Sequence, residues 1–257
     1  FRRVLFRSAI FAPVIAPYDP TYQDYSAVLA APSMAHPFGT DEYGRDILSR
    51  IIYGSRVSIS IGIVAQVVAS FVGVILGAVA GYYGGRIDSI ISRIMEIFQA
   101  FPDLIFAMAI MTFLGKGVLN LFIALGLLTW VRTARMIRGS VMQLKEKEYI
   151  EASRACGAST FWIITKGLIP NCLSTIIVLV TLGIPNAIMY EASLSFLGIG
   201  IQPPTPSWGN MISAAQTFIS YRPVYSIMPG VAIMVTVIAF NIFGDGLRDA
   251  LDPKLKN

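Results

Sequence analysis

The segment from Val57 to Tyr83 contains no charged residue and is long enough to cross a lipid bilayer as a single helix. A membrane-spanning helix needs about 20 mostly apolar residues, and it satisfies its backbone groups within the segment. The pair Gly84 and Gly85 favours a helix end, and Arg86 is typical of the membrane surface. We therefore expect a chain built from helices that lie in lipid.

Other apolar segments predict an all-α, polytopic membrane protein. The chain has 257 residues, of which 55% are hydrophobic and 14% charged, and this composition excludes an ordinary soluble domain. Further candidate crossings lie within residues 87–114, 118–138, 172–190 and 224–243. We interpret residues 9–17 as the remainder of a truncated first crossing, so about six helices are expected.

The remaining segments are assigned from their composition. Residues 1–8 fit neither a signal peptide nor a membrane helix, and we interpret them as a non-native scar. Residues 18–56 are predicted to form an external loop with an interfacial helix, because apolar residues between Ile47 and Ile52 recur at helical spacing. Residues 57–246 are predicted to form the transmembrane domain, and residues 247–257 a cytoplasmic tail.

The distribution of Lys and Arg predicts the orientation. If residues 145–170 lie in the cytoplasm, twelve Lys and Arg residues fall on the inner side and five on the outer side. Basic residues are enriched in cytoplasmic loops, so this orientation is expected. It also places Cys156 and Cys172 on the reducing side, where a structural disulfide is not expected.

Polar residues inside the candidate crossings predict a polar path. In residues 87–114, apolar side chains occupy one helix face and polar side chains the other, and Pro102 is expected to kink the helix. An ionisable group near the bilayer centre costs about 2.5–3.5 kcal/mol, so it normally faces protein or water. The translocation-path candidates are Glu96, Gln99, Asp103, Asn186 and Glu191. A structural ion pair is the alternative role for the charged candidates, for example between Glu96 and Arg93.

Two regular spacings mark faces of the predicted helices. The first is a stripe of small residues: Ser70, Gly73, Gly77 and Gly81. It suits close packing of one helix against another. The second is a row of arginines: Arg132, Arg135 and Arg138. It is typical of a helix that enters the anionic headgroup layer, and Asp88 is expected at the same boundary as a solvated charge.

A polar, mildly basic insert between two crossings predicts a helix–turn–helix. Residues from Lys145 favour a short helix, and Gly157 stands where a left-handed C-terminal cap would end it. Ser159 can cap a second helix from Thr160, and Pro170 suits the first turn of the next crossing. The small side chains leave a shallow surface that suits docking to a partner, and a plain solvated connector is the alternative.

The insert sequence EASRACGASTFWIITKGLIP resembles the EAA loop of ABC-transporter permease subunits. The matching residues are Glu151, Ala152, Gly157 and Pro170, and the departures are Ser153, Gly167 and Ile169. Four further phrases resemble the second permease subunit of dipeptide, oligopeptide and nickel importers: HPFGTDEYGRDILSRIIYGSR, AFPDLIFA, EASLSFLGIGIQPPTPSWG and FNIFGDGLRDALDP. The resemblance therefore covers nearly the whole chain.

This resemblance implies a fold, a function and partners. It implies the transmembrane fold of type I ABC importers, with residues 145–170 as the coupling loop, in the plasma (inner) membrane of a bacterium or archaeon. The implied ATPase-coupling residues are Tyr149, Glu151, Ala152, Ser153, Arg154, Gly157, Ala158 and Pro170. The implied partners are a second permease subunit, two cytoplasmic ATP-binding subunits and an extracytoplasmic solute-binding protein, which together import peptides or a related solute such as nickel.

The sequence itself argues against nucleotide hydrolysis by this chain. A phosphate-binding loop follows GxxxxGK[ST], and FLGKGV around Lys116 lacks the hydroxyl residue and the preceding Gly. ATP and Mg²⁺ are therefore expected on partner subunits, and this chain is expected to have no catalytic residues, metal, cofactor or nucleic-acid partner.

An ion-driven secondary transporter is the alternative function, but it predicts inverted repeats, which the two halves do not show. A membrane-embedded enzyme would need a nucleophile and base set, which is missing.

Overall fold

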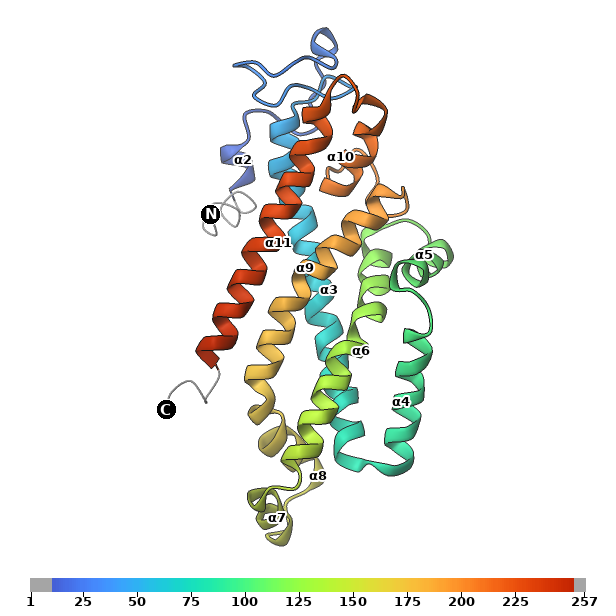
Figure 1. Cartoon of the computed structure of the whole chain (residues 1–257), viewed down its shortest axis with the longest axis vertical. Helices are drawn as coiled ribbons and strands as arrows, with labels where there is room; N and C mark the ends of the chain where they lie inside the picture. The colour runs from blue at the N-terminus through green and yellow to red at the C-terminus, as the bar shows by residue number, and fades with distance from the viewer. Residues whose placement is uncertain (1–10, 252–257) are drawn as a thin grey trace.

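Long helices running side by side make up the body of the molecule, with loops and short helices at one end and α7 at the other (Figure 1). The computed structural model describes residues 11–251. The α-helices are α2 Ala12–Ile15, α3 Ile47–Tyr83, α4 Gly85–Gln99, α5 Asp103–Leu114, α6 Val118–Leu144, α7 Glu148–Ala155, α8 Thr160–Trp162, α9 Leu173–Phe196, α10 Trp208–Ala215 and α11 Pro223–Leu251. The 3₁₀ turns are η1 Tyr25–Ala27, η3 Pro170–Cys172 and η4 Gln216–Phe218, and η2 Ile163–Leu168 is π-helical.

The predicted all-α membrane fold is confirmed for the described residues. Four of their helices are long and apolar enough to cross a membrane, and the bent pair α4 and α5 would make a fifth span. The predicted scar at residues 1–8 lies outside the described residues, as do residues 252–257 of the predicted tail. Of the predicted first crossing, the described part forms only the four-residue helix α2.

α3 runs without a break from Ile47 to Tyr83. Asp46 caps its first turn, because one carboxylate oxygen accepts hydrogen bonds from the Ser49 backbone N–H and hydroxyl, each at 2.7 Å. The interfacial helix predicted within residues 18–56 is therefore continuous with the predicted crossing. The sequence around Arg56 and Val57 contains no residue that would end the helix. The apolar residues after Asp46 therefore form the first turns of the same helix that contains the predicted crossing.

α3 and α6 pack closely along the predicted stripe of small residues, which confirms its role. A Cβ atom on Gly77 would lie 2.4 Å from the Ala134 carbonyl oxygen, and one on Gly81 would lie 2.7 Å from the Arg138 carbonyl oxygen. Gly73 is blocked by backbone in the same way. The two backbones therefore approach to a distance that no larger residue allows at these positions.

The segment from 87 to 114 forms two helices rather than one kinked crossing. α4 and α5 meet at an angle of 91°. Pro102 has no N–H to donate, and Phe101 before it is disfavoured in the α-helical region, so the chain leaves the helix here. Pro102 is extended, and Asp103 starts the new helix. The chain therefore turns sharply between two separate helices at Pro102, where the sequence predicted a kink within one helix.

The return from the insert into the membrane is one continuous helical run from Thr160 to Phe196. Pro170 lies inside this run, at the first position of the turn η3 and directly after the π-helical segment. The wider turn helps to accommodate a residue that donates no N–H. α11 is also longer than predicted: it continues to Leu251, so the first residues of the predicted tail are helical.

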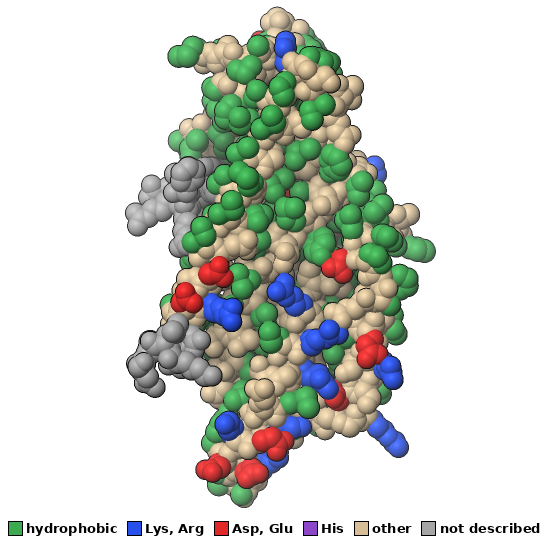
Figure 2. Space-filling view, viewed as in Figure 1, with side chains coloured by type: hydrophobic (Ala, Val, Ile, Leu, Met, Phe, Trp, Pro, Cys, Tyr) green, Lys and Arg blue, Asp and Glu red, His purple; other side chains and the backbone are tan. Residues whose placement is uncertain are grey.

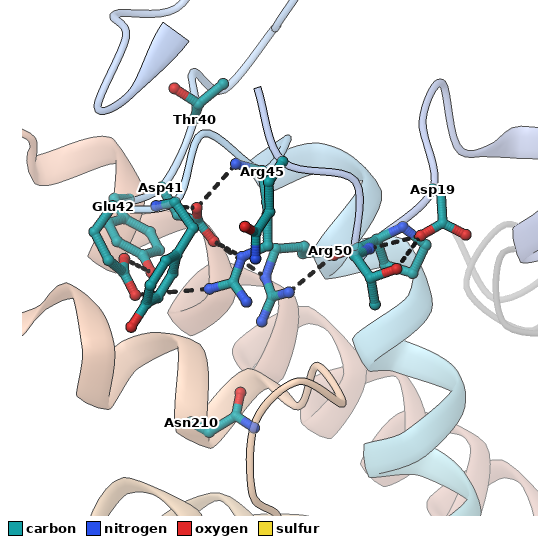
Figure 3. Close-up of polar contacts among 12 residues, drawn as sticks. Asp19, Thr40, Asp41, Glu42, Arg45, Arg50 and Asn210 are labelled. Atoms are coloured by element: carbon teal, nitrogen blue, oxygen red, sulfur yellow. Dashed lines mark hydrogen bonds and ion pairs between the residues drawn. The ribbon is translucent and has the colours of Figure 1, made fainter. Parts of the chain in front are cut away.

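A buried charge network joins the loop before α3 to the helices below it (Figure 3). The Asp41 carboxylate lies 2.6 Å from Arg45 Nε and 3.5 Å from Arg50 Nε, and all three side chains are buried. The Tyr225 hydroxyl at the start of α11 donates to Glu42 at 2.7 Å. Because removing one member of such a group would leave a buried charge without compensation, the network fixes the loop on the bundle.

The distribution of charge agrees with the predicted orientation. Figure 2 shows hydrophobic side chains over much of the bundle, whereas most Lys, Arg, Asp and Glu side chains gather toward the end that carries α7. That end contains the insert and the ends of α3 and α6. We therefore take the α7 end as cytoplasmic.

Substitution of Gly77 by Ala is expected to destabilise the chain. The new Cβ would lie 2.4 Å from the Ala134 carbonyl oxygen, so α3 and α6 must separate. Overpacking of this kind costs about 1–3 kcal/mol. Gly126→Ala is the matched control, because a Cβ there meets nothing within 4 Å. Thermal unfolding in detergent measures both, and equal midpoints for Gly77→Ala and wild type would contradict the prediction.

Candidate functional site

A cavity of about 440 Å³ lies among α3, α4, α5, α6 and α9. Its volume is in the range typical of small-molecule sites. Its polar lining includes Gln66, Gln99, Asp103, Arg132, Arg135, Asn186 and Tyr190. We call this space the central cavity. Three of the five predicted path residues, Gln99, Asp103 and Asn186, line it together.

The corner between α4 and α5 brings two of these residues to the cavity. Gln99 is the last residue of α4, and Asp103 is the first of α5. The Tyr190 hydroxyl of α9 donates a hydrogen bond to the Asp103 carboxylate at 2.5 Å. A carboxylate in the first turn of a helix is also stabilised by the helix dipole. Asp103 is therefore fixed at the cavity wall by a neutral donor.

Arg132 and Arg135 lie on α6 at a spacing of three and therefore share a helix face. Both line the central cavity, although the row of arginines predicted contact with lipid headgroups. Arg135 donates a hydrogen bond to the Gln99 side chain. Sequence periodicity identified this face of α6 correctly but could not show that it lies beside α4 and α5 at the cavity. These two arginines are site residues that the sequence reasoning missed.

The third arginine of the row holds α4 against α6. Arg138 makes a two-pronged ion pair with Asp88, with an Nη2 to Oδ2 distance of 2.6 Å. The prediction that Asp88 is a solvated end charge is therefore wrong. A guanidinium and a carboxylate in this paired geometry form a strong, directional contact. The pair fixes the start of α4 on α6.

Glu96 takes the alternative role that the sequence left open. It forms an ion pair with Arg93 at 2.9 Å, and both side chains are exposed. Glu96 is not among the residues that line the central cavity. A surface pair of this kind contributes little to stability. The structure therefore gives no support to Glu96 as a path residue of this cavity.

Glu191, the remaining predicted path residue, does not line the central cavity. Its side chain is fully buried where α9 packs against α3 and α10. Its two carboxylate oxygens accept hydrogen bonds from Ser58 at 2.8 Å and from Ser195 at 2.7 Å. The Ser58 oxygen in turn accepts from the Trp208 backbone N–H. Hydroxyl donors therefore satisfy this carboxylate within the packed helices.

The insert folds as the sequence predicts. α7 ends before Gly157, whose φ of +80° is the left-handed conformation of a helix-ending glycine. Ser159 accepts a hydrogen bond from the Trp162 backbone N–H and caps the next helix. Ile150 is fully buried and anchors α7, with its Cδ1 so close to Gly167 that a Cβ there would lie 2.9 Å away.

The rest of the insert surface is exposed at the tip of the molecule (Figure 1). The exposed members of the predicted coupling set are Tyr149, Glu151, Ala152, Arg154, Gly157 and Pro170, and Ser153 and Ala158 are half-buried. The Arg154 guanidinium also lies 5.3 Å from the centre of the Tyr82 ring, which connects the insert to the end of α3. Phe161, 77% exposed, adds an aromatic side chain that the sequence reasoning did not assign to the surface.

A membrane bundle with a polar cavity between its helices and a protruding helical loop at one end has the architecture of a transporter subunit. The sequence profile of one family, the binding-protein-dependent transport system inner membrane components, matches residues 73–257. The chain belongs to this family.

Curated relatives match nearly the whole chain. The glutathione transport system permease protein GsiD of Pectobacterium atrosepticum is 42% identical over all of this chain and 86% of its own length. The dipeptide transport system permease protein DppC of Bacillus subtilis is 45% identical over 98% of this chain and 79% of its own length. The di/tripeptide permease DppC of Pseudomonas aeruginosa is 41% identical over all of this chain and 87% of its own.

A solved structure confirms the fold. A chain of the MetNI methionine ABC transporter in an inward-facing conformation superposes with a TM-score of 0.64, covering 80% of this chain and 98% of its own. At 20% identity this likeness shows the transmembrane fold of ABC importers and nothing about the solute.

Family membership settles the class of function. The chain is a multi-pass permease subunit of the inner membrane, it is not catalytic, and it binds no cofactor of its own. The described residues contain no group of three or more His, Cys, Asp or Glu side chains that could hold a metal ion. Membership also implies ATPase and binding-protein partners. The ion-driven alternative is therefore wrong.

Replacing Glu191 should reduce stability. Glu191→Leu leaves the Ser58 and Ser195 hydroxyls without their acceptor, at a cost of about 1–3 kcal/mol in the free energy of unfolding. Glu191→Gln keeps an acceptor and should lose less. Glu96→Leu is the matched control, because that side chain is exposed. Thermal unfolding in detergent tests this, and wild-type stability of Glu191→Leu would contradict the buried structural role.

Proposed function

We propose that the chain is the second permease subunit of an ATP-driven importer of small peptides, including glutathione-like ones. The supporting observation is the identity of 41–45% to dipeptide, di/tripeptide and glutathione permeases across nearly the whole chain. Those names give no support to nickel as the solute. The binding protein would deliver the peptide to the outer end of the bundle.

The partner permease would complete the path. The central cavity is lined by α3, α4, α5, α6 and α9 of one chain, and a second, homologous permease in a heterodimer would close its open side. Gln99, Asp103 and Asn186 would line this path, and Glu96 and Glu191 are left out of it for the reasons given above. Alternating access would then expose the cavity first to the outside and then to the cytoplasm.

The coupling loop would transmit the motion of two ATPase subunits. It joins α6 to the helical run that becomes α9, and both helices line the central cavity. Its short helix α7 is exposed on one side and anchored by Ile150 on the other. A push on α7 would therefore reach both cavity helices, because Ile150 belongs to a packed cluster that includes Ile137 and Val141 of α6 and Leu168.

A cysteine at Ala152 should crosslink to a cysteine in the cleft of the ATPase subunit, with a yield that changes on adding ATP. Ala152 is exposed on α7, and Cys156→Ser with Cys172→Ala removes competing thiols. Ala31→Cys, exposed in the loops at the opposite end, should form no such crosslink. Lack of a crosslink in a co-purified complex would make the insert a plain connector.

The assembled complex should import a dipeptide into vesicles. We expect uptake of radiolabelled dialanine in proteoliposomes that contain both permeases and the ATPases with ATP inside, and the binding protein outside. Uptake should fall to background without ATP, because ATP hydrolysis by the partner subunits would drive the import. Ni²⁺ is the comparison solute. ATP-dependent uptake of Ni²⁺ without uptake of peptide would overturn the assignment of the solute.

A further inference from the structure

The charged groups of the central cavity do not neutralise one another. Asp103 is hydrogen-bonded to the Tyr190 hydroxyl and Arg135 to the Gln99 side chain, both of which are neutral partners. Arg132 forms no hydrogen bond or ion pair with any described residue. Every described ion pair lies elsewhere, for example Arg138 with Asp88 and Arg93 with Glu96. The cavity therefore presents one negative and two positive groups that are free to bind.

Charges without a counter-charge are costly at membrane depth. An ionised group there is normally tolerated when it pairs, faces water or marks a solute pathway. Tyr190 gives Asp103, and Gln99 gives Arg135, a neutral hydrogen-bond partner in place of a counter-charge. A solute that carries both charges would satisfy both sides of the cavity at once.

We propose that the central cavity is a binding site for a zwitterionic solute, in which Asp103 binds the ammonium end and Arg132 and Arg135 bind the carboxylate end. This inference rests on the proposed peptide-import function and deepens it. The arginines are three residues apart on one helix face, so both guanidinium groups can reach one carboxylate. A peptide with two free termini has the required pair of charges.

A second cavity next to the proposed site indicates where a bound solute would move next. It has a volume of about 470 Å³ and lies among α6, α9 and α11. Arg132, Met136 and Leu179 line both cavities, so the two lie next to each other. The second cavity adds Arg248 and the hydroxyls of Ser140 and Ser174, and among residues 11–251 no carboxylate lines it. Arg132 thus stands where a bound carboxylate would pass from one cavity to the next.

The experiment uses Asn186→Cys as a reporter in the central cavity. The assembled complex of permeases and ATPases carries it together with Cys156→Ser and Cys172→Ala, and the binding protein is omitted so that its own selectivity does not contribute. A thiol reagent is added with increasing dialanine, its C-terminal amide or its N-acetyl form. We expect free dialanine to protect the thiol at roughly tenfold lower concentration than either blocked form, since each lost terminus removes a charge-assisted contact.

Variants assign each end of the peptide to its residues. The double variant Arg132→Gln, Arg135→Gln should abolish the preference for the free peptide over the amide and retain the preference over the acetyl form. Asp103→Asn should do the reverse. Arg93→Gln is the matched control, because it removes an exposed arginine outside the cavity. It should keep both preferences, which excludes a general effect of net charge.

The inference and the proposed function fail in different ways. Equal protection by all three ligands, or preferences that survive the variants, would overturn the zwitterion site. Absence of any protection in a complex that imports dialanine with ATP would overturn it as well and leave the import function standing. Selective protection in a complex that imports no peptide would support the site and refute the proposed function.

Discussion

The close approach of α3 and α6 is the constraint on which the other contacts of the bundle depend. Gly73, Gly77 and Gly81 allow the backbones to meet without intervening side chains. This contact fixes the rotation of α6 about its axis. With the α3 side of α6 occupied, Arg132 and Arg135 face α4, α5 and α9 across the central cavity, and Arg138 meets Asp88 on α4. A stripe of small residues thus determines where the charges point.

The same helices connect the cavity to the coupling loop. α6 enters the loop at Leu144, and the helical run that begins at Thr160 returns as α9. Arg132 lies about 18 Å along α6 from that entry, at 1.5 Å per residue. A packed helix moves as a unit over such a length, because the interior is dense and resists local deformation. Displacement of α7 would therefore shift the two cavity walls together.

Sequence reasoning reached the features that local chemistry determines. The turn at Gly157, the Ser159 cap and the regular spacing of Gly73, Gly77 and Gly81 can be recognised from residues close in sequence, and all three were predicted. Features set by contacts between distant segments were not. Glu191 and Asn186 are both polar residues of α9, but only the partners Ser58 and Ser195 show that the first is buried in packing. The α4–α5 corner likewise decides which residues lie beside Arg132 in the central cavity.

The corner also explains how opposite charges can coexist in one cavity without pairing. Because Pro102 ends α4, Asp103 stands at the N-terminus of α5, where the helix dipole favours a negative charge. The Tyr190 hydroxyl supplies a further donor, so the carboxylate needs no arginine. Gln99, at the other side of the corner, occupies Arg135 with a neutral acceptor. Asp103 and Arg135 thus each have a neutral partner within the chain, which keeps both charges available to a ligand and avoids a closed ion pair that a solute would have to break.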